Sequence, residues 1–324
     1  MLTKPDFMFK KIIVVFPHQG EKISFKNDNF VVNSGENKIK YQISCYKLFM
    51  VFIVGGSTIT SGIIERTKKF GFSIILTNMN FKVYETINFE MEGNTLLREK
   101  QYNNNCSIDI SCKIIQNKIN NQIQTIDNLR DKKNNQLKYK LSNYVLQLEN
   151  VKELNTIMGI EGNAAKEYFK TIFGNINWKG RKPRVKHDET NLLLDIGYTL
   201  LFNFIEAILR TYGFDIYKGN LHQEFYKRKS LVCDVIEPFR PIIDYRIRKM
   251  HSLKELDTVN FILVQGKYTI DWKDNTKIMM MFLEAILEYR ECIFDYIQKY
   301  YRWFMKEQDF NNFPVARLKK NDIN

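Results

Sequence analysis

One short stretch of the sequence contains a histidine and two acidic residues, side chains that can bind a metal ion. His222 precedes Asp234 and Glu237 within residues 219–244. Since residues three apart lie on the same face of a helix, Asp234 and Glu237 are predicted to point the same way. Carboxylate oxygens suit Mg²⁺ and Mn²⁺, and an imidazole is compatible with Mn²⁺. This spacing admits two interpretations, a divalent-metal site or a chance grouping of structural residues.

The charge of the chain indicates the class of partner. Its 324 residues carry a net charge of +13. Such an excess favours polyanions through the release of counterions, so nucleic acid is the leading partner and an anionic membrane the competing one. The longest apolar run, 48–54, is far shorter than the roughly 20 residues that cross a bilayer. The N-terminus lacks the apolar core of a signal peptide. We therefore expect a cytoplasmic protein.

Hydrophobic spacing predicts an α+β protein. Residues 9–87 contain short β-branched runs between turn signals, with one helix expected over 61–70. From residue 107 to about 307 the spacing is helical, and the Asn and Lys residues opposite the isoleucines of 114–126 are predicted to face solvent. We expect a small β-rich domain over 1–88, a linker over 89–106, and a larger all-α domain over 107–324, which contains the candidate metal- and DNA-binding residues.

The loop 175–186 is the most basic segment of the second half. After Trp178 it carries five basic residues and no acid, namely Lys179, Arg181, Lys182, Arg184 and Lys186. A loop of this composition can hold a phosphate backbone or single-stranded ends. A solvated loop without a ligand is the alternative interpretation.

Four short motifs occur in a fixed order along the second half. The first is E-G-x-x-A-x-x-Y-F, which begins at Glu161, and the second is D-x-x-N-x-x-L-x-x-G-Y-x-L-L, which begins at Asp188. The third is G-x-L-H at 219–222, and the fourth is S-L-x-x-D-x-x-E-x-F-R-P at 230–241. This order resembles the CRISPR-associated Cas1 family, the integrases of CRISPR adaptation, over nearly the whole chain. Tyr217 departs from the pattern, because many members have a proline or a leucine-rich turn there.

The resemblance implies a metal-dependent DNA integrase and endonuclease. Glu161, His222 and Glu237 would hold Mg²⁺ or Mn²⁺, with Asp234 as a supporting catalytic residue. The 3′-hydroxyl of a captured double-stranded fragment would attack the CRISPR repeat by transesterification. The protein would be a homodimer, joined through its N-terminal domain, that assembles with a small Cas2-like protein. The lysine- and asparagine-rich composition fits a type V system.

Further basic residues then become candidate phosphate contacts. Besides the five of loop 175–186 they are Lys227, Arg228, Lys229, Arg240, Arg246 and Arg248. Arg240 is equally suited to a structural ion pair.

Two other functions stay open. A branched-DNA repair nuclease would use the same site with water as the nucleophile and release free ends instead of joined strands. A non-catalytic basic scaffold would bind DNA equally well in EDTA and yield no product.

Overall fold

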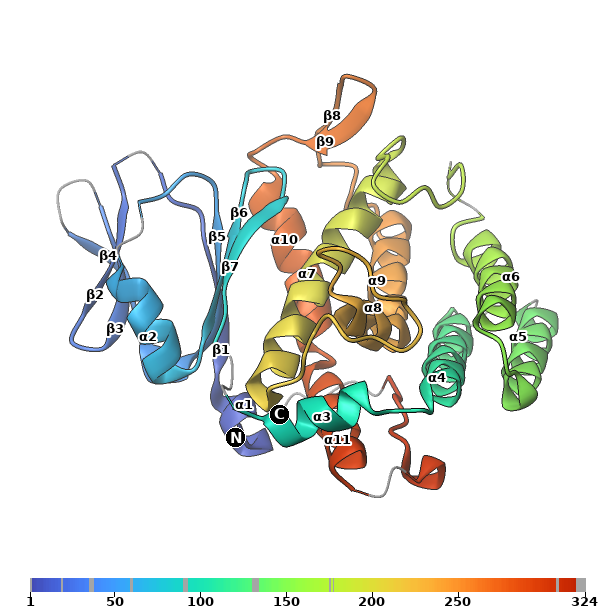
Figure 1. Ribbon diagram of the computed structural model, residues 1–324. Coiled ribbons are helices and arrows are strands. Elements are labelled where there is room, and N and C mark those ends of the chain that lie inside the picture. Colours follow the sequence, from blue (N-terminus) through green and yellow to red (C-terminus); the bar gives the residue numbers. More distant parts are fainter. Residues whose placement is uncertain are drawn as a thin grey trace. The chain divides into compact units, whose positions relative to one another are not determined.

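The chain folds into two compact units (Figure 1). Unit 1 comprises Met1–Asn94 and Glu206–Phe214, and unit 2 comprises Thr95–Ile205 and Asp215–Asn324. The structure is a computed structural model that describes residues 2–18, 20–34, 38–58, 61–89, 93–129, 134–174, 176, 178–306 and 309–318. Unit 1 is rich in strands and unit 2 is mainly helical, which confirms the predicted α+β class.

Unit 1 contains two sheets. The first has the strand order β1 (Lys11–Val15), β5 (Leu48–Val54), β6 (Ser73–Thr77) and β7 (Val83–Ile87). Its first three strands are parallel and β7 is antiparallel. The second sheet is antiparallel and consists of β2 (Lys22–Lys26), β3 (Asn29–Asn33) and β4 (Ile39–Ser44). Strand β5 is buried along its length, as its unbroken apolar sequence requires.

Three short helical elements complete unit 1. They are α1 (Lys4–Phe9), the 3₁₀ turn η1 (Cys45–Lys47) and α2 (Gly62–Phe70). Helix α2 places Ile63 and Phe70 in one core with buried residues of both sheets. The strands and the helix expected between residues 9 and 87 are therefore confirmed, whereas α1 was not predicted.

Unit 2 is a helical assembly. Its elements are α3 (Thr95–Tyr102), α4 (Ser107–Asn128), α5 (Asn135–Gln147), η3 (Leu148–Asn150), α6 (Leu154–Ile172), α7 (Glu189–Tyr212), α8 (Ser230–Ile236), η4 (Glu237–Phe239), α9 (Arg240–Ser252), α10 (Asn275–Leu287), α11 (Arg290–Met305) and η5 (Phe310–Asn312). The division into units assigns the last residues of α7 to unit 1. By length and composition α7 passes as a membrane span, yet 83% of its most apolar window is buried. It is the core helix that an all-round apolar sequence predicts.

Two elements differ from the sequence-based expectation. Helix α3 lies within the segment 89–106 that was expected to be a linker. A hairpin of β8 (Phe261–Val264) and β9 (Lys267–Ile270) interrupts the region expected to be helical. Its turn residues Gln265 and Gly266 have φ of 50° and 76°. Positive φ at both central residues is typical of a two-residue hairpin turn. The helical spacing on either side of this segment led us to expect helix here as well.

Helix α4 is buried on both of its faces. It contacts α5, α6, α8, α9 and η4, so most of the Asn and Lys residues expected to face solvent are covered, although Asn120 is exposed. Asn117, Lys118, Asn121 and Gln122 are all buried. Asn121 donates to the carbonyl of Pro238 at 2.8 Å, and Asn117 donates to that of Pro314 at 3.1 Å. Apolar spacing locates the first buried face, but it does not reveal that a second, polar face is also covered.

Gly197 on α7 gives a stability prediction. A Cβ at this position would lie 2.4 Å from Ile243 Cγ2 on α9 and 3.0 Å from Phe282 Cε1 on α10. Because the core has no space for it, Gly197→Ala should lower the free energy of unfolding by about 1–3 kcal/mol, measured by urea denaturation.

The matched control is Gly159→Ala on α6, where a Cβ meets no atom within 4 Å. This change should be neutral or stabilising by up to about 1 kcal/mol through helix propensity. Equal effects of the two substitutions would contradict the packing argument.

Candidate functional site

Two acidic residues from different elements contact the same lysine. Lys118 on α4 donates to Glu161 Oε1 on α6, and its Nζ lies 2.7 Å from Glu237 Oε2 on η4. Lys118 and Glu237 are buried, while the side chain of Glu161 is 30% exposed. The fold thus brings Glu161 and Glu237, which are far apart in sequence, to one buried positive charge.

The charges in this cluster stabilise one another. Arg240 Nε donates to Glu237 Oε1 at 2.8 Å. Burial would raise the pKa of Glu237, but Arg240 and Lys118 outweigh it and hold that pKa at about 2, with a smaller contribution from His222. Burial would likewise lower the pKa of Lys118, but Glu237 and Glu161 raise it above its ordinary value. Glu237 is therefore a carboxylate throughout the neutral range.

Two prolines determine where Glu237 points. Helix α8 ends at Ile236, and Glu237–Phe239 form a 3₁₀ turn before α9 starts at Arg240. Pro238 and Pro241 lack an N–H and cannot extend α8 regularly, so the chain tightens and restarts here. The bond from Asn121 to the Pro238 carbonyl then ties this turn to α4, on the side where Lys118 lies.

Asp234 organises the loop that carries His222. Its carboxylate accepts hydrogen bonds from the backbone N–H groups of Asn220, Leu221 and His222. Its Oδ1 also lies 2.8 Å from His222 Nδ1. Since a carboxylate only accepts, Nδ1 carries the proton in this contact, and in the neutral ring Nε2 is then the nitrogen with the lone pair. An aspartate that orients a histidine in this way is typical of metal-ligand histidines.

Gly219 permits this loop to close. A Cβ at Gly219 would lie 2.7 Å from Ser230 Cβ and 2.8 Å from the carbonyl oxygen of His222. The backbone of the loop therefore packs directly against the first residue of α8. This close approach explains physically why a glycine stands three residues before the histidine.

The four predicted site residues form two pairs. Asp234 binds the loop of His222, and Glu237 faces Lys118 and Arg240. Within the part of the chain that the structure describes, no group of three or more His, Cys, Asp or Glu side chains is arranged to hold a metal ion. A lysine nitrogen instead joins the two carboxylates.

Residues 178–186 of the basic loop 175–186 include both internally paired and exposed cations. Arg181 donates to Asn191 at 3.1 Å and to Asp195 at 2.8 Å, so its charge supports the loop itself. Trp178 packs against Phe169 of α6 and Phe173 just after its end, with ring centroids 5.6 and 5.4 Å apart, and therefore serves packing more than base stacking. The exposed basic residues are Lys179, Lys182 and Arg184, and Lys186 is partly exposed.

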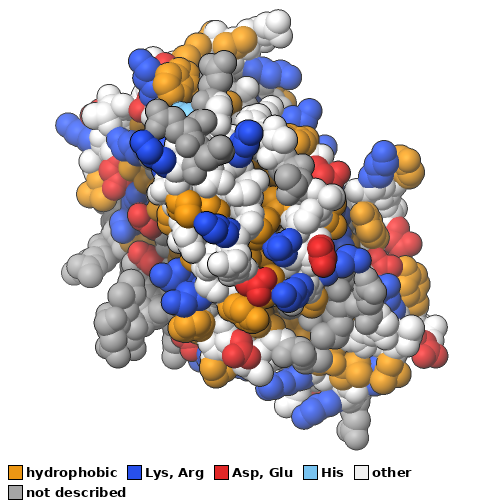
Figure 2. Space-filling model, turned by 90° about the vertical axis from the view of Figure 1, so that its left-hand side faces the viewer, with side chains coloured by type: hydrophobic (Ala, Val, Ile, Leu, Met, Phe, Trp, Pro, Cys, Tyr) orange, Lys and Arg blue, Asp and Glu red, His pale blue; other side chains and the backbone are white. Residues whose placement is uncertain are grey.

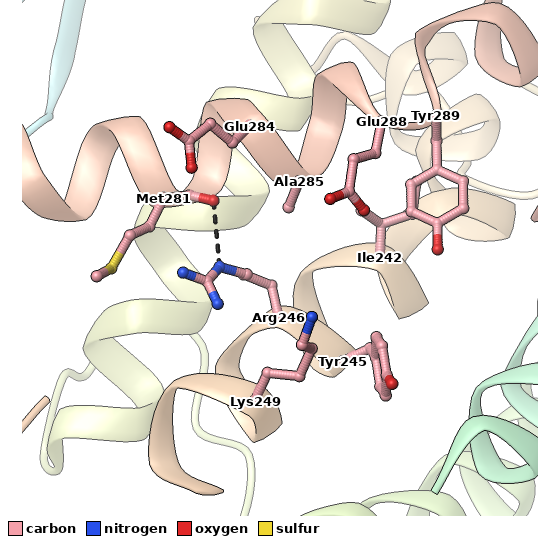
Figure 3. Close-up of a pocket in the computed structure, with 9 residues that line it drawn as sticks. All are labelled: Ile242, Tyr245, Arg246, Lys249, Met281, Glu284, Ala285, Glu288 and Tyr289. Atoms are coloured by element: carbon pink, nitrogen blue, oxygen red, sulfur yellow. Dashed lines mark hydrogen bonds between the residues drawn. The ribbon is translucent and has the colours of Figure 1, made fainter. Parts of the chain in front are cut away.

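The remaining basic candidates also divide into two groups. Lys227 and Arg228 are exposed, while Lys229, Arg240, Arg246 and Arg248 are partly buried. Arg246 lines a pocket of about 180 Å³ between α9 and α10 (Figure 3). There it donates to the Met281 carbonyl at 3.3 Å and pairs with Glu255 at 2.8 Å. These contacts give Arg246 a structural role, and none of Glu161, His222 and Glu237 lines the pocket.

Sequence reasoning missed two features near the predicted site. Lys118 was assigned to a solvated helix face, and only its repeated polar neighbours 117, 121 and 122 could have signalled a buried polar surface. Phe225 and Tyr226 are 75% and 80% exposed between His222 and the basic residues that follow. Adjacent exposed aromatic and basic residues are a pattern of nucleic-acid contacts.

Positive charge is dispersed over the surface in view. On the face drawn in Figure 2, Lys and Arg side chains lie among acidic and hydrophobic ones without forming one continuous patch. The net charge of +13 therefore supplies a diffuse attraction to polyanions on this face.

A buried carboxyl lies behind Arg240. Tyr198 donates to Asp244 Oδ1, and the Arg240 guanidinium lies 4.5 Å from the centroid of the Tyr198 ring. Burial raises the pKa of Asp244 to about 7, although the Tyr198 hydrogen bond and the charge of Arg240 act in the opposite direction. The cation that binds Glu237 is thus itself supported by an aromatic ring and an acid.

The comparison with protein families decides the identity of the fold. The sequence-family model described as CRISPR associated protein Cas1 matches residues 14–284 of this chain. The chain belongs to the Cas1 family. It is 28% identical over 226 residues to the CRISPR-associated endonuclease Cas1 1 of Thermodesulfovibrio yellowstonii, covering 65% of this chain and 71% of that protein. It is 33% identical over 176 residues to the Cas1 1 endonuclease of Chlorobaculum tepidum, covering 48% and 51% of the two chains.

Solved Cas1-like structures share the fold. A Cas1 protein from Thermotoga maritima has a TM-score of 0.79 at 18% identity, covering 93% of this chain and 99% of its own. A casposase bound to integration product has a TM-score of 0.78 at 19% identity, covering 97% of both chains. A Cas6-RT-Cas1–Cas2 complex has a TM-score of 0.79 at 19% identity, but this chain spans only 36% of the matched chain. The resemblance to the Cas1 family is therefore confirmed, and the type V assignment stays a prediction.

Asp244 gives a pH prediction for this Cas1 chain. An unfolded aspartate has the ordinary pKa of 3.8, so between about pH 4 and 7 the folded protein keeps a proton that the unfolded chain has lost. Wild-type stability should fall as the pH rises through this window and then level off. Asp244→Asn has no carboxyl group to titrate. As the pH rises through this window, its free energy of unfolding relative to that of wild type should therefore rise by on the order of a few kcal/mol.

The measurement is urea unfolding of both proteins at a series of pH values from 4 to about 8. Asp244→Asn also removes the acceptor for Tyr198, which changes the free energy of unfolding by the same amount at every pH. Only the pH-dependent part of the difference between the two proteins therefore reports on the titration of Asp244. A difference that is constant with pH would show that the buried carboxyl is ionised throughout.

Proposed function

We propose that this Cas1-family chain is a metal-dependent DNA integrase and endonuclease of CRISPR adaptation. The reaction would join the 3′-hydroxyl ends of captured DNA to the repeat of a CRISPR array. One observation carries the proposal: Glu161 and Glu237, each within its own family motif, converge on a single buried position that holds a positive charge. Membership of the Cas1 family supports a role for that position in the reaction.

The donor chemistry of the site fits a hard divalent cation. Glu237 Oε2 is buried and accepts no well-directed hydrogen bond from any described residue, its contact with Lys118 being ionic. Glu161 is partly exposed and contributes a second carboxylate. Glu161, Glu237 and the Nε2 atom of His222 would hold Mg²⁺ or Mn²⁺. When bound, such an ion supplies Lewis-acid polarisation of a phosphoryl oxygen.

The surrounding residues of the chain would act by positioning and charge. Asp234 fixes the tautomer and the ring orientation of His222. Arg240 keeps Glu237 ionised from the side opposite Lys118. In the reaction, an attacking 3′-hydroxyl forms a new phosphodiester bond and releases the 3′-hydroxyl of the cut strand, so phosphodiester bonds are exchanged without net hydrolysis. Holding the two strands in line is the main contribution expected of the protein.

The partners follow from the same proposal. We expect double-stranded DNA, a second copy of the chain and a Cas2-like protein, all in a prokaryotic cytoplasm. Support comes from the shared fold with a chain of a Cas6-RT-Cas1–Cas2 complex and with a casposase bound to integration product. The exposed Lys179, Lys182, Arg184, Lys227 and Arg228 are the preferred phosphate contacts.

Substitution of the proposed ligands tests the reaction. Glu161→Gln, His222→Ala and Glu237→Gln should each lower the rate of strand transfer in Mn²⁺ by at least about 100-fold, because each removes one ligand. The assay follows joined DNA strands on a denaturing gel. Glu167→Gln, on the same helix as Glu161 but paired with Lys140, is the matched control and should retain activity.

The products also separate the alternatives. Free ends without joined strands in every condition would favour a branched-DNA nuclease. DNA binding unaffected by EDTA, with no product at all, would favour a scaffold. Full strand-transfer activity in any ligand variant would reject that residue as a ligand.

The basic loop gives a prediction about DNA binding. Lys179→Ala, Lys182→Ala and Arg184→Ala combined should reduce the slope of log affinity against log salt by about 2 to 3, since each phosphate contact contributes about 0.9. The measurement is fluorescence anisotropy of labelled duplex DNA over a range of salt concentrations.

A triple variant with the same charge change serves as the control. Lys11→Ala, Lys22→Ala and Lys26→Ala remove three exposed lysines from strands of unit 1, and this variant should keep the wild-type slope. An unchanged slope in the loop variant would mean that loop 178–186 is merely solvated.

A further inference from the structure

Lys118 occupies the position on which the two proposed carboxylate ligands converge. Its Nζ contacts Glu161 on one side and Glu237 on the other. Only 9% of its side chain is exposed. A lysine is seldom buried to this degree unless acids surround it, because an isolated ammonium is strongly disfavoured away from water. Its burial therefore depends on Glu161 and Glu237, and they depend on it.

The local charge balance makes this dependence specific. Glu161 and Glu237 carry two negative charges, and Lys118 and Arg240 carry two positive ones. Arg240 binds Oε1 of Glu237, whereas Lys118 binds Oε2 and also reaches Glu161. Lys118 is thus the cation shared by both acids. Without it, two carboxylates directed at one buried point would repel each other.

The backbone keeps Lys118 in reach of both acids. Asn121, one helical turn after Lys118 on α4, donates to the Pro238 carbonyl in the turn that carries Glu237. Helix α4 also packs against α6, which carries Glu161. The arrangement is therefore part of the folded framework of unit 2, and the long flexible stem of lysine is its adjustable part.

We propose that the Lys118 ammonium is a built-in substitute for the divalent ion, which neutralises Glu161 and Glu237 in the metal-free protein and competes with the ion for their oxygens. The inference rests on the proposed function, in which these two residues are ligands. It makes Lys118 a positioning residue that determines metal affinity. Metal entry requires the ammonium to withdraw from the carboxylates, while Arg240 stays on Glu237.

The test is the direction in which metal affinity changes. In the full chain, Lys118→Met should bind Mn²⁺ roughly tenfold or more tightly than wild type by isothermal titration calorimetry, because a competing charge a few ångströms away is gone. A lysine with a purely structural role predicts the opposite, since its loss would loosen the site. Unchanged or weaker binding therefore overturns the proposal. Lys113→Met, five residues earlier on α4 and partly exposed, is the matched control and should bind as wild type does.

Stability gives an independent readout. In EDTA, Lys118→Met should melt at a lower temperature than wild type, because Glu161 and Glu237 then lack their shared cation. Saturating Mn²⁺ should raise its melting temperature by more than it raises that of wild type. An equal or smaller rise would contradict the proposal.

A double variant covers the case in which Lys118→Met does not fold. Lys118→Met combined with Glu161→Gln leaves a single carboxylate at the position, and it should bind Mn²⁺ more tightly than Glu161→Gln alone. Equal binding of the two would overturn the proposal.

Glu237→Gln separates this inference from the proposed function. Wild-type Mn²⁺ binding that survives unchanged in Glu237→Gln would reject the metal site and the inference with it. Binding that is lost in Glu237→Gln, but not tightened in Lys118→Met, would reject the inference alone.

Discussion

The interior of unit 2 depends on compensating charges that are buried together. A carboxylate such as Glu237 is strongly disfavoured away from water unless cations and hydrogen bonds replace its hydration. Arg240 and Lys118 do so here, and they hold the pKa of Glu237 at about 2 despite its burial. Each member stabilises the charged form of the others. The elements that supply them, α4, η4 and α9, must therefore be correctly packed before the cluster can exist.

The polar face of α4 follows from this requirement. A helix that contacts the candidate site with one face and a hydrophobic core with the other cannot show the simple amphipathic pattern of a surface helix. Its asparagines donate to backbone carbonyls, at Pro238 in the turn before α9 and at Pro314 near the C-terminal end. The buried amides of α4 therefore help to hold the irregular turn that positions Glu237.

The sequence predicted the layout well and the site in part. Short β-branched runs placed the strands of unit 1, and helical spacing placed the long helices of unit 2, because both signals are local. The hairpin at 261–270 was missed because its two-residue turn, with positive φ at Gln265, gives only a weak sequence signal between segments that have strong helical spacing. Family motifs selected Glu161, His222, Asp234 and Glu237, but spacing alone could not show that Asp234 and Glu237 bind different partners. Lys118 escaped prediction because burial of a polar face depends on tertiary packing.

The two cations around Glu237 differ in what they allow. Arg240 presents a planar guanidinium, lies against the ring of Tyr198 and binds one carboxylate oxygen, which together keep it in one orientation. Lys118 is a point charge at the end of four methylenes, and it can leave the carboxylates without any change in the backbone of α4. In the proposed metal site, Arg240 would stay on Glu237, and Lys118 would have the ability to withdraw when a metal ion binds. Exchange of these two residue types would leave the charge balance intact while removing that ability.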